Sequence, residues 1–349
     1  MEKNEKLKKN SEQENKKNSK QNLLSLNDVS TEFILDVIEK AIDIKKNPEK
    51  YSSALKGKTL LMIFEKPSLR TRVSFEVGMT QLGGHAIYYD VATSPLGKKE
   101  TIEDTGKVVS RYVDIVMARL FKFEDCKKLA ENAIVPVIDA LSDMNHPCQI
   151  LCDLMTIKEK FGKLNNDVNN LNNNVNSNGL KGLTLAYLGD CKNNVTYSLM
   201  HGCAHVGMNI KVACPNDAEY MPEQRIVDEA RMIAKKNIKL YDETKVEVLH
   251  DAKEAVKNAD IVYTDSWMSY HIPKELMEAR KQKLMPFQVT AQLMKHAKPT
   301  AVFMNCLPAM RGMEQTAEVV DGKQSIVFDQ AENRLHAQKA IMLKLLGKI

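Results

Sequence analysis

Apolar and polar positions follow two different periods along this chain. In residues 31–46, apolar side chains recur every three or four residues, which is the spacing of an amphipathic helix. Further along, short apolar runs alternate with helical patterns, and we predict strands at residues 59–64, 86–89, 115–119, 184–188, 210–214, 261–264 and 301–304. Strands separated by helices are typical of βαβ units, so the pattern predicts parallel sheets.

The chain length and this pattern together predict an α/β fold of two domains. Each domain is expected to hold a mainly parallel sheet flanked by helices, with interdomain helices linking the two. At 349 residues the chain exceeds the roughly 150 residues of a typical single domain. We expect a first domain at residues 24–156, completed by a C-terminal helix within 321–349, and a second domain at 157–320.

Two segments show neither the helical spacing of apolar residues nor the apolar runs of strands. Residues 1–23 are mostly Lys, Glu, Asn, Gln and Ser. Such a composition buries too little apolar surface to offset the entropy of ordering, so we expect a disordered tail and folded structure from near Leu24. Residues 165–179 are dominated by Asn, which predicts a mobile surface insertion within the second domain.

The overall composition excludes several classes of protein. Hydrophobic residues make up 43% of the chain and charged residues 27%, as in an ordinary globular protein. No apolar run approaches the ~18 residues of a membrane span, so no membrane partner is expected. The net charge is +5, but the first 22 residues hold seven Lys against four Glu. The remainder is too weakly basic to favour a nucleic-acid partner.

The cysteines and the N-terminal charges indicate the compartment. Seven cysteines are scattered without a CxxC pair, a pattern that fits reduced thiols. The N-terminal lysines are interspersed with Glu2, Glu5, Glu12 and Glu14, unlike an acid-poor transit peptide, and no apolar signal-peptide core follows. We therefore expect a cytoplasmic protein.

The strongest chemical motif follows the first predicted strand. Residues 65–72 read EKPSLRTR, and a helical pattern starts near Val73. A strand, a Pro-Ser turn and a helix N-terminus place free backbone N–H groups and the positive end of the helix dipole toward a ligand. Two arginines add bidentate donors that match phosphate oxygens. The segment therefore predicts an anion site, because it is more specific than an ordinary helix cap.

This segment also resembles a known family. FEKPSLRTR is similar to the FxKxSTRTR signature of the aspartate and ornithine carbamoyltransferases. Four further segments resemble family elements in the same order: HPCQ at 146–149, DSW at 265–267, CLP at 306–308 and AENR at 331–334. The resemblance extends over residues 24–349, and HPxQ with CLP resembles the ornithine branch more than the aspartate branch.

The resemblance implies a substrate pair and a set of site residues. Carbamoyl phosphate would be held by Ser68, Leu69 through its backbone, Arg70, Thr71, Arg119, His146, Gln149, Cys306, Leu307 and Arg334. Ornithine would be held by Asn194, Asp265, Ser269 and Tyr270, and the catalytic residues would be Arg119, His146, Cys306 and Asp265. No metal and no cofactor is implied. The family forms trimers with active sites at subunit borders, so a homotrimer is expected, with residues 94–100 reaching a neighbour's site.

Three positions depart from the family pattern and leave other functions open. Leu69 replaces the usual Thr, residues 269–272 read SYHI where the family has SMG after DxW, and Asn305 replaces the His before CLP. The alternatives are a carbamoyltransferase for another amine, such as putrescine, and a catalytically silent member that acts as a binding or regulatory subunit. Retention of Arg70, Arg119, His146 and Arg334 favours the enzyme.

Two further clusters have alternative interpretations. Asp190 and Asn193 follow the strand predicted at 184–188, where turn chemistry and ligand contact are equally favoured. His201 and His205 have the i, i+4 spacing of a zinc pair on a helix, but no third ligand is evident, so helix packing is favoured.

Overall fold

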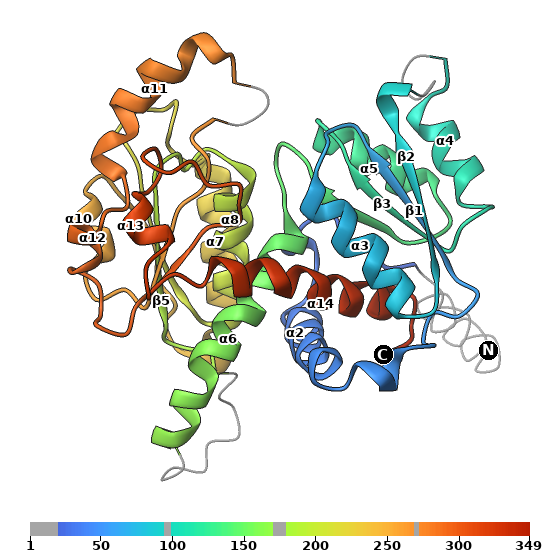
Figure 1. The fold of residues 1–349 in the computed structure, drawn as a ribbon, viewed down its shortest axis with the longest axis horizontal. Helices are drawn as coiled ribbons and strands as arrows, with labels where there is room; N and C mark the ends of the chain where they lie inside the picture. The colour runs from blue at the N-terminus through green and yellow to red at the C-terminus, as the bar shows by residue number, and fades with distance from the viewer. Residues whose placement is uncertain (1–19, 94–98, 170–178, 269–271) are drawn as a thin grey trace, which may run out of the picture.

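Two parallel sheets form the frame of the molecule (Figure 1). The computed structural model describes residues 20–93, 99–169, 179–268 and 272–349. The first sheet has the strand order β2-β1-β3-β4 and the second the order β7-β6-β5-β8-β9. Every strand pair in both is parallel, so the predicted fold class of two helix-flanked parallel sheets is confirmed.

The elements follow one another as alternating strands and helices. The strands are β1 (Thr59–Phe64), β2 (His85–Asp90), β3 (Ile115–Arg119), β4 (Val137–Leu141), β5 (Thr184–Leu188), β6 (Asn209–Ala213), β7 (Val246–Leu249), β8 (Ile261–Tyr263) and β9 (Val302–Met304). The helices of the first half are α2 (Thr31–Lys46), α3 (Leu69–Gln81), α4 (Ile102–Val109) and α5 (Phe123–Asn132). The later helices are α6 (Pro147–Asn169), α7 (Asn194–Val206), α8 (Gln224–Lys236), α9 (Ile238–Tyr241), α10 (Ala252–Val256), α11 (Met277–Leu284), α12 (Ala291–Met294), α13 (Ala317–Val320) and α14 (Val327–Leu345).

The strand orders place a crevice at the carboxyl end of each sheet. From the neighbouring strands β1 and β3 the chain runs in opposite directions, to β2 and to β4, and from the neighbouring strands β5 and β8 it likewise runs to β6 and to β9. Loops that diverge from a pair of neighbouring parallel strands leave open space between them, and ligands bind there. The central strands are almost fully buried, as expected where helices cover both faces of a parallel sheet.

Three helices join the two halves. α6 and α14 run between them, and α2 lies beside both, as Figure 1 shows. α14 packs against α2, α3 and α6, so the C-terminal helix lies against the half that contains the first sheet. The expected domain boundary between residues 156 and 157 falls inside α6, which is a single continuous helix.

The strand predictions missed two strands and misplaced one helix start. Neither strand is an unbroken apolar run. β4 carries a buried Asp139 in its centre, and β7 is a short edge strand that contains the half-buried Glu247. α3 begins at Leu69, four residues before the expected Val73, because Ser68 caps it: the Ser68 side chain accepts a hydrogen bond from the Thr71 N–H.

The two unpatterned segments are only partly described. Residues 1–19 and 170–178 lie outside the described residues. Leu23, which was assigned to the tail, is fully buried and exchanges backbone hydrogen bonds with β4, donating to the Val137 carbonyl and accepting from the Asp139 N–H. Folded structure therefore starts earlier than expected. The expected insertion at 165–179 also starts too early, because α6 continues to Asn169.

Candidate active site

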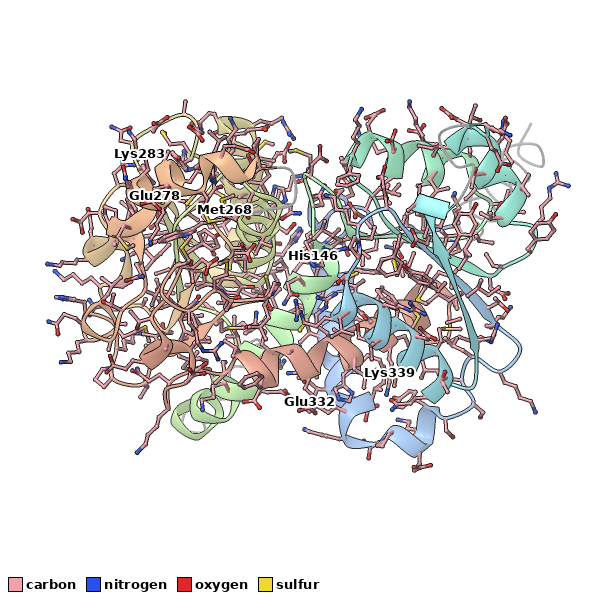
Figure 2. All side chains as sticks on the ribbon, turned by 45° about the horizontal axis from the view of Figure 1, so that its top comes forward. His146, Met268, Glu278, Lys283, Glu332 and Lys339 are labelled. Carbon is pink, nitrogen blue, oxygen red and sulfur yellow. The ribbon has the colours of Figure 1, made fainter. Side chains whose placement is uncertain are left out.

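A cavity of about 840 Å³ is lined by residues that follow strands of both sheets. It brings together the predicted residues Ser68, Leu69, Arg70, Thr71, Arg119, His146, Gln149, Asn194, Asp265, Cys306, Leu307 and Arg334. Figure 2 shows His146 between the two halves, with Met268 on the side of the second sheet. Ser269 and Tyr270 lie outside the described residues, as does most of the predicted 94–100 loop.

The N-terminus of α3 forms one end of the cavity. Ser68 Oγ donates to Thr71 Oγ1 at 3.0 Å, which holds both hydroxyls at the start of the helix. Leu69 is 75% exposed, and its apolar side chain carries no donor, so only its backbone N–H can donate to a ligand. Arg70, in the first turn, lines the cavity. The first turn thus combines hydroxyls, backbone donors and a guanidinium, which together suit an anion.

Only one of the two arginines of the motif reaches the cavity. The Arg72 guanidinium lies 3.8 Å from the centroid of the Tyr88 ring and pairs with Glu76 on the helix surface. Arg72 therefore belongs to the outer face of α3, and the expectation that both guanidiniums face the anion is wrong for Arg72.

Arg119 and Lys66 add positive charge beside the helix N-terminus. Arg119 is the last residue of β3, and both side chains are buried. Burial lowers the pKa of Lys66, and the nearby Arg119 lowers it further. Two buried cations at a cavity wall create a local positive potential that favours an anionic ligand.

His146 is placed by contacts from both halves. Its backbone N–H donates to Ser198 Oγ on α7 at 2.9 Å, and Pro147 starts α6 immediately after it. Burial lowers the pKa of His146 well below its usual value, and Arg334 and Arg119 act in the same direction. The imidazole is therefore neutral near pH 7. Among the described residues, its buried Nδ1 has no hydrogen-bond partner, which indicates a position for a ligand.

Gln149 and Arg334 connect three helices at the cavity wall. Arg334 of α14 donates from Nη1 to Gln149 Oε1 of α6 at 2.7 Å, and from Nη2 to Thr71 Oγ1 of α3 at 3.4 Å. Both Gln149 and Arg334 are buried. The predicted donor-site residues of α3, α6 and α14 thus form one hydrogen-bonded group.

Asp265 and Cys306 meet at the other end of the cavity. The Cys306 thiol donates to Asp265 Oδ1 across 3.1 Å, joining the turn after β8 to the turn after β9. Burial raises the pKa of Asp265, and the thiol hydrogen bond opposes that rise. Burial also raises the pKa of Cys306 well above its usual value, and the Asp265 carboxylate raises it further. Cys306 therefore stays a thiol, which suits an orienting role better than a nucleophilic one.

The turn after β5 contributes Asn194 and structural neighbours. Asn194 Nδ2 donates to the Ser142 carbonyl, which follows β4 of the other sheet. Asn193 caps α7 by accepting from the Thr196 N–H at 2.9 Å, and it also lines the cavity. Asp190 pairs with the buried Arg280 guanidinium and does not line the cavity. The ion pair with Arg280 and a turn bond from the Lys192 N–H therefore account for Asp190, whereas Asn193 combines a helix cap with a place at the wall.

Asn305 shapes a turn and is not itself part of the cavity wall. Its Oδ1 accepts from the Leu307 N–H at 2.7 Å, and its Nδ2 donates to Gln315 Oε1 at 3.2 Å. Leu307 has φ of 56°, a left-handed conformation that costs energy for a branched residue. The Asn305 side chain supports this conformation and so presents Leu307 to the cavity. Asn305, where the family has His, therefore affects the conformation of this turn and does not contact the ligand position directly.

Several wall residues were missed. Lys66 stood inside the recognised motif, and its position directly after a strand was the available signal. Ser142 and Asp143 follow β4, a strand that was not predicted, so the rule that ligands bind at strand ends could not be applied there. Met268 follows the DSW segment and directly precedes Ser269, the first residue of this loop that the resemblance assigns to ornithine.

The paired histidines of α7 serve packing. His205 Nδ1 lies 2.9 Å from Thr31 Oγ1 and its Nε2 lies 2.9 Å from the Leu26 carbonyl oxygen, while His201 Nε2 lies 3.2 Å from a Glu229 carboxylate oxygen. Within the part of the chain that the structure describes, no group of three or more His, Cys, Asp or Glu side chains is arranged to hold a metal ion. In the same residues, no helix combines the length and apolarity that crossing a membrane requires.

Comparison with known families identifies the class that this fold and site define. The family description "Aspartate/ornithine carbamoyltransferase, carbamoyl-P binding domain" matches residues 21–159. The companion description, "Asp/Orn binding domain" of the same family, matches residues 181–345. The chain belongs to the aspartate/ornithine carbamoyltransferase family, whose members are enzymes, so the resemblance read from the motifs is confirmed.

Similar individual proteins bear the name of the ornithine branch. An ornithine carbamoyltransferase of Thermococcus kodakarensis is 45% identical over 94% of this chain and 96% of its own length. An anabolic ornithine carbamoyltransferase of Pyrococcus furiosus is 45% identical with the same coverage. The solved structure of the Pyrococcus furiosus ornithine carbamoyltransferase matches with a TM-score of 0.84 at 44% identity, over 95% of this chain and 98% of that one. The Giardia lamblia ornithine transcarbamoylase structure gives 0.83 at 44% identity, over 94% and 98%.

Proposed function

We propose that the chain is an ornithine carbamoyltransferase, which transfers the carbamoyl group of carbamoyl phosphate to the δ-amine of L-ornithine. The products are L-citrulline and phosphate, and the reaction is reversible. The observation that carries this proposal is the composition of the cavity described above: cations and a helix N-terminus lie at one end, and the Asp265–Cys306 pair lies at the other. Such a cavity suits an anionic donor at one end and an amine acceptor at the other.

At the donor end, the phosphate would lie on the first turn of α3. Ser68, Thr71, Arg70 and the backbone N–H of Leu69 supply its hydrogen-bond donors. Attack of the amine on the carbamoyl carbon places negative charge on the carbonyl oxygen. Donors that are already positioned stabilise such developing charge. Arg119 and the neutral His146 would act on that oxygen, and phosphate would leave along α3.

The acceptor end would hold the zwitterionic part of ornithine and orient its δ-amine. Asp265 offers a carboxylate to the α-ammonium, and Asn194 offers an amide to the α-carboxylate. Ser269 and Tyr270 would complete the acceptor site, as the family pattern implies. Cys306, as a thiol beside Asp265, would orient the attacking amine, and the Asp265 carboxylate would ease the amine's proton loss by accepting from it.

We assign the two substrates to the two halves of the molecule. Residues 24–156, completed by 321–349, would form the carbamoyl phosphate domain, and 157–320 the ornithine domain. A reaction of this kind supplies citrulline for arginine metabolism. All seven cysteines are free thiols, which supports a cytoplasmic location. Thiol labelling of intact and fractionated cells would test that location.

The acceptor is tested by one side-by-side assay. Carbamoyl phosphate-dependent product formation is measured with ornithine, putrescine, lysine and aspartate at one pH. A site built to pair with polar groups rejects an analogue that lacks them by factors up to ~10⁴ to 10⁵, so ornithine should exceed putrescine in kcat/KM by at least ~10². A preference for putrescine would contradict the assignment of ornithine as acceptor, while the assignment of carbamoyl phosphate as donor would stand. No turnover with any amine would favour a silent binding subunit.

A homotrimer is supported by an apolar stripe on α3. Leu69, Val73 and Val77 lie one turn apart on its outer face and are 75%, 47% and 37% exposed. Ile87 on the neighbouring edge strand β2 is 41% exposed. Exposed apolar residues grouped on neighbouring elements are a feature of protein interfaces. Sedimentation at micromolar concentration should give three times the chain mass, and Val73→Asp should reduce it. A stable, active monomer would contradict the assignment.

A further inference from the structure

One buried carboxylate of α6 lies behind the cavity wall and has no place in the reaction described above. Asp153 is fully buried and lies one helical turn after Gln149. Its Oδ1 accepts from Gln149 Nε2 at 2.8 Å and from Gln330 Nε2 at 2.7 Å, and its Oδ2 accepts from Tyr263 OH at 2.9 Å. These partners come from α6, α14 and β8, so the carboxylate joins the two halves of the molecule.

Asp153 determines which way the Gln149 amide points. An ionised carboxylate only accepts hydrogen bonds and a guanidinium only donates them. The amide of Gln149 lies between these two kinds of group, with Nε2 at Asp153 and Oε1 at Arg334. The reversed amide would set its oxygen against the carboxylate and its NH₂ against the Arg334 guanidinium. One orientation is therefore strongly preferred.

The same argument applies to Gln330 on α14. Its Nε2 donates to Asp153, and its Oε1 accepts from the backbone N–H of Asn305 at 3.0 Å. A backbone N–H only donates, so this amide also has a single orientation. Asn305 begins the turn that carries Cys306 and Leu307 to the cavity. One carboxylate oxygen thus orients two amides, one at the donor end of the cavity and one behind the turn after β9.

The preferred orientation has a consequence for the ligand. Oε1 of Gln149, a residue of the cavity wall, has a second lone pair besides the one used by Arg334. This lone pair can accept a hydrogen bond from an NH₂ group of a bound ligand, whereas the reversed amide would place donor against donor. We propose that Asp153 is a positioning residue: from the seam between the halves it holds the Gln149 amide with its oxygen available to the NH₂ of carbamoyl phosphate. The proposal rests on the proposed function.

The charge on Asp153 is maintained at working pH. Burial raises the pKa of this carboxyl to about 6, and the hydrogen bonds from Gln149, Gln330 and Tyr263 oppose the rise. The carboxylate is therefore mostly ionised near pH 7 and above. Ionised acceptors make hydrogen bonds roughly twice as strong as neutral ones, so removal of the charge should loosen the Gln149 amide even where an acceptor oxygen remains.

Two substitutions at Asp153 separate charge from hydrogen bonding. Asp153→Asn keeps one acceptor oxygen at nearly unchanged volume, and Asp153→Leu removes every acceptor. The KM for carbamoyl phosphate should rise about tenfold in the first and at least ~100-fold in the second, following the strengths of charged and neutral hydrogen bonds. The KM for ornithine should change less than the KM for carbamoyl phosphate in Asp153→Asn, because Asp153 bonds Gln149 directly but reaches the turn of Cys306 only through Gln330 and the Asn305 backbone.

A matched control lies one turn further along α6. Thr156 Oγ1 donates to the Cys152 carbonyl and accepts from Asn333 Nδ2 at 3.0 Å, so it also joins α6 to α14 but does not contact Gln149. Thr156→Val should lower the melting temperature about as much as Asp153→Asn, with a KM for carbamoyl phosphate within threefold of wild type. A merely structural role for Asp153 would give both variants the same KM and so overturn the proposal.

Calorimetry distinguishes failure of this inference from failure of the proposed function. Wild-type protein is titrated first with carbamoyl phosphate and then with inorganic phosphate. If wild type binds neither and turns over no amine, the proposed function fails and the inference fails with it. If wild type binds carbamoyl phosphate and Asp153→Asn binds it equally well, the proposed function survives and the role of Asp153 is refuted. Asp153→Asn decides the matter alone if Asp153→Leu does not fold.

Discussion

The donor end and the acceptor end of the cavity are built in different ways. The donor end is lined by four cations: Lys66, Arg70, Arg119 and Arg334. It also holds a buried His146 Nδ1 that has no hydrogen-bond partner in the described residues. At the acceptor end, the polar groups are already paired, with Asp265 accepting from Cys306 and Asn194 donating to the Ser142 carbonyl.

This difference shows how the two substrates would be recognised. The donor end holds positive charge in place before any anion arrives, so little reorganisation accompanies binding. At the acceptor end, a ligand exchanges existing hydrogen bonds for its own, and only the difference between them favours binding. Variants at the donor end should therefore cause larger losses than variants at the acceptor end.

The largest effect is expected for Arg70→Ala. This variant removes bidentate contacts to phosphate, and charged hydrogen bonds are worth ~1.5–3 kcal/mol each, so kcat/KM for carbamoyl phosphate should fall at least ~10³-fold. Arg72→Ala is the matched control, since this residue lies on the outer face of the same turn and should change kcat/KM less than threefold. Steady-state kinetics that give equal losses in the two variants would refute the anion site.

Asp265→Asn should have the next largest effect, on the acceptor alone. Loss of the charge opposite the α-ammonium should lower kcat/KM for ornithine by ~10² and reduce the preference over putrescine. Calorimetric binding of carbamoyl phosphate should stay within threefold of wild type, because Asp265 lies at the other end of the cavity. A variant that weakens carbamoyl phosphate binding as much as it weakens ornithine turnover would show that the two ends are not separate.

A change of one pH unit should have a smaller effect on kcat/KM for ornithine than either of these substitutions. The attacking amine must be neutral, and alkylammonium pKa values lie near ~10, so kcat/KM for ornithine should rise about tenfold per unit from pH 6 toward pH 9. The depressed pKa of His146 means that this side chain stays neutral throughout the range, since it takes up a proton only at lower pH. In Asp153→Asn, which removes the carboxyl whose pKa is about 6, the Kd for carbamoyl phosphate should thus show no step near pH 6.5. A step in that variant would assign a charged imidazole to the donor end.

The smallest effect is expected for Leu69→Thr, which restores the usual residue of the family signature. Leu69 lines the cavity and is 75% exposed, but its apolar side chain carries no hydrogen-bond donor, so only its backbone N–H can bond the phosphate. Donor kinetics should change less than threefold. Sedimentation should be followed in parallel, because the same side chain belongs to the apolar stripe of α3. A tenfold gain in carbamoyl phosphate affinity would mean that a hydroxyl reaches the phosphate.

The sequence alone determined the fold class and most of the chemical inventory. Strands at 59–64, 115–119 and 184–188 match β1, β3 and β5 to the residue, because a strand covered on both faces is an unbroken apolar run with clear ends. The motif at 65–72 predicted a helix N-terminus directly after a strand, and the structure has this local arrangement. From the other predicted segments, the residues that reach the cavity wall are His146, Gln149, Asp265, Ser266 and 306–308.

The tertiary structure decided which of these residues face the cavity and which support it. Arg70 and Arg72 share one motif, yet only the rotation of α3 against α14 and β2 separates the inward from the outward guanidinium. The central Asp139 concealed β4, and with it Ser142 and Asp143. Asp153 gave no local signal, because its role depends on Tyr263 and Gln330, more than a hundred residues away in the chain. A hydrogen bond between distant segments depends on how the sheets and helices pack, and that packing has no counterpart in local sequence pattern.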